Sequence, residues 1–110
     1  MIQLLPRYFF HHDDRGSIEG IINQGEWHEI NLIVSDAGVM RGNHYHTKIR
    51  ELFIILEGII EVTVKKVECD HLTDEEYTIL VRSGDAFIIE PYYLHIFVPK
   101  THSRWLNVLS

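Results

Sequence analysis

The stretch that decides the fold is GVMRGNHYHTKIRELFIILEG, which spans residues 38–58. It contains three side chains that can bind a metal ion, namely His44, His46 and Glu51. Side chains alternate between the two faces of a β-strand, so His44 and His46 are predicted to point the same way, with Tyr45 on the opposite side. Two imidazoles are therefore expected to converge on one point.

The residues that follow the histidines predict a hairpin and a buried strand. Thr47–Arg50 has a suitable length for a hairpin loop, and the next segment, Glu51–Leu56, is almost entirely apolar. Glu51 opens this strand beside the histidines. Burial of a carboxylate is unfavourable unless a positive or hydrogen-bonding group meets it. A cation held together with the two histidines would be such a group.

A fourth ligand is offered by the stretch GDAFIIEPYYLH, residues 84–95. Gly84–Asp85 is a turn signal, and Ala86–Ile89 is a short apolar run that Pro91 closes. His95 begins the next predicted strand, which runs to Val98. The second half of the chain thus supplies a third imidazole at the start of a strand.

Together the two stretches resemble the motifs of the cupin superfamily. The first motif, G-x5-H-x-H-x(3,4)-E-x6-G, is matched position for position by residues 38, 44, 46, 51 and 58. The second, G-x5-P-x-G-x2-H-x3-N, is matched at Gly84 and His95. Its proline comes one place late at Pro91, Tyr93 replaces the middle glycine, and Pro99 replaces the asparagine.

The cupin resemblance implies an all-β fold, a cupin-type antiparallel barrel or jelly roll, formed by residues 1–110 as a single domain. It also implies one metal ion held by His44, His46, Glu51 and His95, and assembly as a homodimer. Apolar residues on both faces of strand 51–56 favour the homodimer as well, because one small barrel interior covers only one face.

The rest of the chain is consistent with such a fold, since no stretch has a helical period. Within the long strand predicted at Ile59–Val67, apolar and polar residues alternate, which is typical of a half-solvated strand. A turn is predicted at Asp13–Ser17 and a polar loop at Asp70–Glu76. The remaining predicted strands are 18–22, 29–34, 77–81 and 103–109.

Composition narrows the functional classes. The 110 residues carry a net charge of −6, which argues against nucleic acid or an anionic membrane as a partner because both require a basic face. Cys69 is the only cysteine, so no disulfide can form within the chain and a cytoplasmic location is expected. No uninterrupted apolar run approaches the roughly eighteen residues of a membrane span.

The predicted ligands limit the metal without identifying it. Three imidazoles and one carboxylate suit divalent iron, manganese, nickel, zinc or copper. Four protein ligands on a six-coordinate ion would leave two positions open, for a substrate that forms an enediolate or for dioxygen. The other candidate ligands, His11–His12 and Cys69–His71, lie in polar, charged contexts and are predicted to be solvated.

A finer resemblance concerns the substrate. Asp13–Ser17 and Arg41–His46 are similar to the nucleotide-sugar branch of cupins, which includes dTDP-sugar 3,5-epimerases, dTDP-sugar 3,4-ketoisomerases and the epimerase-like domains of capsular-polysaccharide enzymes. This resemblance implies that Arg41 binds an anion and that His44 or His46 is the catalytic base. Tyr93 is expected at the mouth of the barrel, as a substrate contact or as edge packing.

These observations lead to one hypothesis with two alternatives. The chain is predicted to be a small metal-binding cupin that acts on a sugar or sugar nucleotide by proton transfer next to a carbonyl, as an epimerase or isomerase does. The alternatives are a metal-dependent dioxygenase and a cupin that binds a small ligand without turnover.

Overall fold

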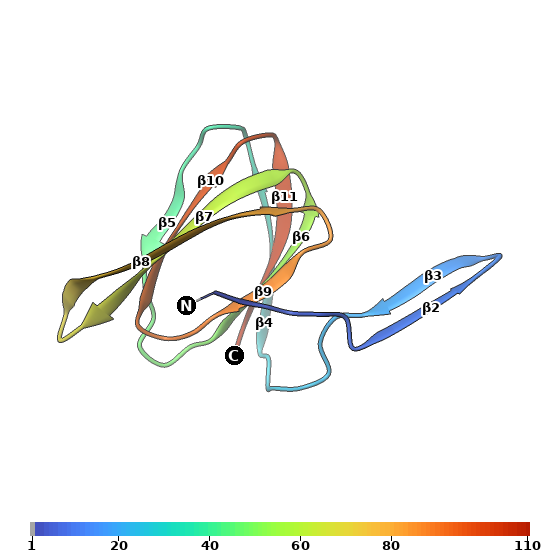
Figure 1. The fold of residues 1–110 in the computed structure, drawn as a ribbon, viewed down its shortest axis with the longest axis horizontal. Coiled ribbons are helices and arrows are strands. Elements are labelled where there is room, and N and C mark those ends of the chain that lie inside the picture. Colours follow the sequence, from blue (N-terminus) through green and yellow to red (C-terminus); the bar gives the residue numbers. More distant parts are fainter. Residues whose placement is uncertain (1) are drawn as a thin grey trace.

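The computed structural model describes residues 2–110, and all of its regular structure is β-strand (Figure 1). No helix that could cross a membrane occurs in these residues. The strands are β1 (Ile2–Leu4), β2 (Phe9–Asp13), β3 (Gly16–Gly20), β4 (Glu29–Ser35), β5 (Arg41–His44), β6 (Glu51–Glu57), β7 (Ile59–Glu68), β8 (His71–Arg82), β9 (Ala86–Ile89), β10 (Tyr93–Pro99) and β11 (Ser103–Leu109).

Two antiparallel sheets form the body of the molecule. A five-stranded sheet has the order β1-β9-β6-β11-β4, and a four-stranded sheet has the order β5-β10-β7-β8. The largest core side chains lie between them, among them Phe53, Phe87, Phe97 and Trp105. The predicted all-β antiparallel architecture is therefore confirmed.

Alternation along β7 explains how this strand is placed. Ile60, Val62 and Val64 are at most 1% exposed, whereas the residues between them are half-buried. The polar residues between the apolar ones keep one face of the strand partly in water, as the sequence predicted. In the five-stranded sheet, by contrast, Leu52 and Phe53 are both buried, on opposite faces of β6.

The segment Thr47–Arg50 is not a hairpin loop, contrary to the prediction. β5 pairs with β10, whereas β6 pairs with β9 and β11, so the segment crosses from one sheet to the other. The reason is burial. β6 is apolar on both faces and takes the centre of the larger sheet, whereas the polar, exposed β5 lies at the edge of the smaller one.

The predicted polar loop Asp70–Glu76 is also wrong, because β8 already begins at His71 and pairs with β7. The turn consists of Cys69 and Asp70, with φ angles of 51° and 63°, and positive φ at both central residues is what a type I′ hairpin turn requires. Near this turn the side chains of β8 are mostly exposed, so no apolar alternation marks the strand in the sequence.

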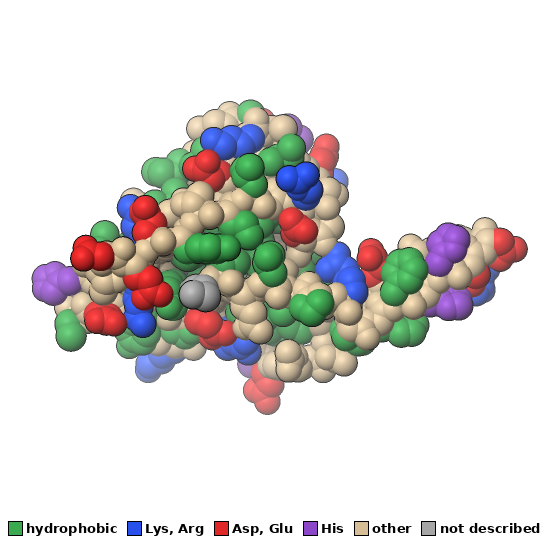
Figure 2. Space-filling view, viewed as in Figure 1, with side chains coloured by type: hydrophobic (Ala, Val, Ile, Leu, Met, Phe, Trp, Pro, Cys, Tyr) green, Lys and Arg blue, Asp and Glu red, His purple; other side chains and the backbone are tan. Residues whose placement is uncertain are grey.

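An arm formed by β2 and β3 projects from the body (Figures 1 and 2), and the principal extents of the molecule are 52 × 31 × 23 Å. The predicted turn at Asp13–Ser17 lies at its tip. The strand predicted at 18–22 is shifted to Gly16–Gly20, and β2 was not predicted. Both strands of the arm expose apolar residues, including Phe10 and Ile18.

Candidate functional site

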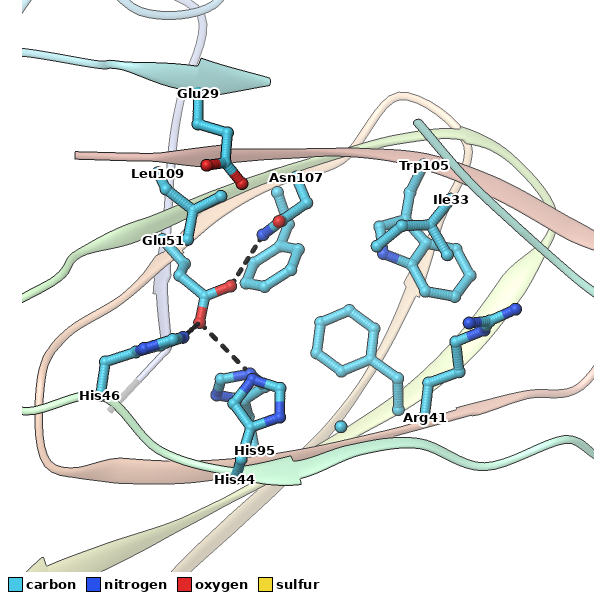
Figure 3. A pocket seen from close by; sticks show the side chains of 13 residues that line it. Glu29, Ile33, Arg41, His44, His46, Glu51, His95, Trp105, Asn107 and Leu109 are labelled. Carbon is cyan, nitrogen blue, oxygen red and sulfur yellow. Dashed lines mark hydrogen bonds and ion pairs between the residues drawn. The ribbon is translucent and has the colours of Figure 1, made fainter. Parts of the chain in front are cut away.

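A cavity of about 310 Å³ opens between the two sheets (Figure 3). It contains the four predicted metal ligands together with residues from β4 and β11. Its walls combine polar and aromatic side chains: Glu29, Ile33, Arg41, Gly42, His44, His46, Glu51, Phe53, His95, Phe97, Trp105, Asn107 and Leu109.

His44, Glu51 and His95 form the most compact group of potential ligands. One ligand atom from each lies within 4.8 Å of the other two. Strand register explains this arrangement, because His44 and His95 are directly opposite each other on β5 and β10. Glu51 reaches the pair from the first residue of β6, in the other sheet.

His46 reaches the same point by a route that strand parity did not predict. β5 ends at His44, and Asn43 has a φ angle of 67°, so regular alternation does not extend to His46. The loop is instead fixed by the N–H of Tyr92, which donates to the carbonyl of His46 at 2.8 Å. As a result, the ring centroids of His46 and His44 are 5.2 Å apart.

Tyr92 holds this loop in an unusual conformation. Its φ angle is 67°, a region that favours glycine, and its carbonyl accepts a hydrogen bond from the N–H of Val67. Tyr92, and not Tyr93, therefore occupies the backbone position where the cupin motif has its middle glycine.

The Glu51 carboxylate is 4% exposed and lies between the imidazoles (Figure 3). Its Oε1 atom is 2.7 Å from Nε2 of His46 and 3.4 Å from Nε2 of His95, and its Oε2 atom accepts a hydrogen bond from Asn107. The short contact with His46 lacks the geometry of a hydrogen bond, and Oε1 has no hydrogen-bond partner among residues 2–110.

This donor set fits a first-row transition metal. A buried carboxylate oxygen without a hydrogen bond faces three imidazoles, and nitrogen and oxygen donors of this kind suit divalent iron, manganese, nickel, zinc or copper. The protonation state of His95 also suits metal binding. Burial lowers the pKa of this imidazole below its usual value of 6.5, against the opposing charge of Glu51, and the neutral form is the one that binds metals.

Arg41 lies in the wall of the cavity at the start of β5. Its Nε donates to Oγ of Ser35 at 3.3 Å, and its Nη2 donates to the carbonyl of Val34 at 3.1 Å. No hydrogen bond from Nη1 is found within residues 2–110. The guanidinium is thus fixed along one edge, while Nη1 is available to an anion.

Tyr93 does not line this cavity. Its side chain borders a separate recess with Val64 and Tyr77, and its ring lies 5.9 Å from Nζ of Lys66. Asn107 and Trp105, in contrast, line the cavity without having been predicted. Alternation along β11 places them on one face, but the sequence of β11 did not indicate that this face meets the histidines.

The polysaccharide biosynthesis C-terminal domain family matches residues 11–107. The chain belongs to this family. No curated protein matches it significantly.

Solved structures with the same fold include nucleotide-sugar enzymes. A sugar 3,4-ketoisomerase from Thermoanaerobacterium thermosaccharolyticum in complex with TDP is 21% identical, with a TM-score of 0.80, and the match covers 99% of this chain and 80% of the ketoisomerase. A 3,4-ketoisomerase from Helicobacter canadensis is 17% identical (TM-score 0.81; coverage 99% and 82%).

A dTDP-4-dehydrorhamnose 3,5-epimerase from Sulfolobus tokodaii is 16% identical to the present chain, with a TM-score of 0.78. The match covers 92% of the chain and 65% of the epimerase. At this level of identity the likeness shows the fold, which is the cupin-type fold expected from the sequence.

Proposed function

We propose that this chain is a metal-binding cupin that acts on a sugar nucleotide by moving a proton next to a carbonyl group. The observation that carries the proposal is the convergence of three imidazoles and the Glu51 carboxylate on one cavity. The shared fold with nucleotide-sugar ketoisomerases and epimerases supports the choice of substrate class.

The metal would be held by His44, Glu51 and His95, whose ligand atoms already lie together, with His46 as the fourth ligand. When bound, a divalent ion acts as a Lewis acid that stabilises the negative charge of an enediolate. His95 is suited to be a metal ligand because burial favours its neutral form, and Glu51 would contribute the negative charge of the ligand set.

Proton transfer requires an imidazole nitrogen that is not occupied by the metal. His44 and His46 are the candidates, because the side chain of His44 is exposed and that of His46 is 28% exposed, whereas His95 is buried. A nitrogen that binds the metal cannot act as the base, so the two roles exclude each other at His44 and at Nε2 of His46. As a base, His46 would lie beside the Glu51 carboxylate, whose Oε1 atom is 2.7 Å from Nε2 of His46.

The cavity sets a limit on how the substrate is bound. Its volume of about 310 Å³ is at the lower end of the range of small-molecule pockets, which is roughly 300 to 1,000 Å³. A sugar ring is the part of the substrate suited to such a space, with the nucleotide extending out of it. Arg41, at the cavity wall, would then pair with a phosphate through its available edge.

The test is deuterium exchange into a panel of dTDP-linked 4-keto sugars, followed by NMR. We expect exchange at a carbon next to the carbonyl with the parent chain, and its loss in His44→Ala or His46→Ala even at saturating substrate. His71→Ala, which changes an exposed histidine outside the cavity, is the matched control.

Metal content separates the two roles of His46. If His46 is a ligand, His46→Ala loses both bound metal and proton exchange. If His46 is the base, His46→Ala loses proton exchange but keeps its metal. Binding without exchange in the parent would contradict the enzymatic proposal and favour a ligand-binding cupin. Oxygen consumption with bound substrate would instead favour a dioxygenase.

A further inference from the structure

We infer that Asn107 is a positioning residue that fixes the Glu51 carboxylate so that its Oε1 atom faces the imidazoles. Asn107 is 8% exposed, lies on β11 and donates from Nδ2 to Oε2 of Glu51 at 2.7 Å (Figure 3). It contacts none of the histidines through a hydrogen bond among residues 2–110, so its link to the ligand group is through Glu51.

The orientation of the Asn107 amide is itself fixed by a second amide. Asn31 lies directly opposite Asn107 in the β4–β11 pairing, and its Nδ2 donates to Oδ1 of Asn107 at 3.3 Å. The same Nδ2 donates to Oε2 of Glu29 at 2.9 Å. The four side chains form a chain of three hydrogen bonds across β4, β11 and β6.

The direction of these hydrogen bonds is determined by the carboxylates at the two ends. Ionised carboxylates only accept hydrogen bonds, so the NH₂ group of each amide must face its neighbouring carboxylate. A flipped Asn107 would turn Oδ1 toward Glu51 and Nδ2 toward the NH₂ group of Asn31, giving one contact between acceptors and one between donors. A single arrangement of Asn107 therefore satisfies both neighbours.

This arrangement divides the two oxygens of Glu51 between two tasks. Oε2 is held by an amide, and Oε1 is left without a hydrogen bond, 2.7 Å from His46 and 3.4 Å from His95. Without Asn107 the buried carboxylate would lose its hydrogen-bond donor and could rotate about its last side-chain bond. The same oxygen would then no longer be directed at the imidazoles.

One test is a Co²⁺ titration monitored by visible absorption, and this test depends on the metal binding proposed above. The variant is Asn107→Leu, which removes the donor at similar size. We expect the Kd for Co²⁺ to rise about 10- to 100-fold and the absorption bands to shift, as is typical when a partner of a ligand is removed. Ser103→Ala is the matched control, since Ser103 is buried on the same strand but bonds to Thr101.

A second test does not depend on metal. Crystal structures of metal-free parent and Asn107→Leu are compared, and we expect the Glu51 carboxylate to rotate in the variant. If Asn107→Leu does not fold, Asn31→Ala replaces it, because it removes the support of the Asn107 amide at a more exposed position.

The outcomes of the two tests are distinguishable. Parent-like affinity and spectrum in Asn107→Leu, or an unchanged carboxylate in the crystal structure, would overturn the inference. If the parent binds no Co²⁺, the proposed metal site fails, and the metal-free crystal structures alone decide the role of Asn107.

Discussion

Glu51→Gln should separate the metal-binding role of this side chain from its structural role. Glu51 is the one carboxylate in the compact ligand group, and glutamine has nearly the same shape. Its amide oxygen can still accept the hydrogen bond from Asn107, but its NH₂ group cannot bind a metal. We therefore expect a small effect on the metal-free protein and a large effect on stabilisation by metal.

The magnitude follows from binding linkage. At a metal concentration 100 times the Kd, the parent gains about 2.7 kcal/mol of unfolding free energy. If the loss of Glu51 weakens binding about 100-fold, the variant gains only ~0.4 kcal/mol at the same concentration. In the metal-free protein we expect a change within ~1 kcal/mol, because a buried charge is removed and the neighbouring His95 is neutral.

The assay is urea unfolding of parent and Glu51→Gln, each with Zn²⁺ and with a chelator. We expect the parent and Glu51→Gln to have similar unfolding free energies in chelator, and to differ by about 2 kcal/mol with Zn²⁺. This reasoning is refuted if Zn²⁺ stabilises both proteins equally. A variant that is several kcal/mol less stable in chelator would show that Glu51 has a structural role that glutamine cannot fill.

Three further predictions concern the ligand, pH and assembly. Arg41→Lys should weaken the affinity for a dTDP-sugar about tenfold, since lysine lacks the paired donors of the guanidinium; equal affinities in a calorimetric titration would exclude a phosphate-binding role. Because the pKa of His95 is lowered in the folded state, the unfolded chain binds more protons than the folded chain below pH 6.5. The unfolding free energy of the metal-free protein, measured in chelator, should therefore fall as the pH drops below 6.5, and His95→Gln should weaken this dependence. An unchanged pH dependence of urea unfolding in the variant would contradict this prediction. Ile30, Leu32 and Val34 expose an apolar row on the edge strand β4, so the parent should sediment as a homodimer and Leu32→Lys as a monomer; a parent that is monomeric at micromolar concentration rules this out.

Much of the barrel could be predicted because apolar patterns mark its buried strands. Apolar and polar residues alternate from Ile60 to Lys65, and strand 103–109 was predicted with the bounds of β11. Where strands leave the body, the pattern disappears. The polar start of β8 was read as a loop because its side chains are solvated, and β2 was missed because it lies in an arm outside the core.

The sequence predicted which potential ligands lie together, but not how the strands and loops bring them together. The resemblance to the cupin motifs implied that Glu51 and His95 share a site with His44, and the structure brings these residues together through pairing and crossing between sheets. For His46 the predicted convergence with His44 is confirmed, but the reason given for it was wrong, because the strand ends before His46 and Tyr92 holds the loop. Asn107 could not be found, since a single amide on a strand carries no motif.

The proposed chemistry depends on a metal ion bound by the cavity histidines and Glu51. This dependence is tested most directly by elemental analysis of the chain purified without chelators and without a nickel column. We expect close to one divalent first-row ion per parent chain and at least a tenfold loss in His44→Ala, which removes an exposed member of the ligand group. A parent without such metal that still catalyses proton exchange, or full occupancy in His44→Ala, would contradict it.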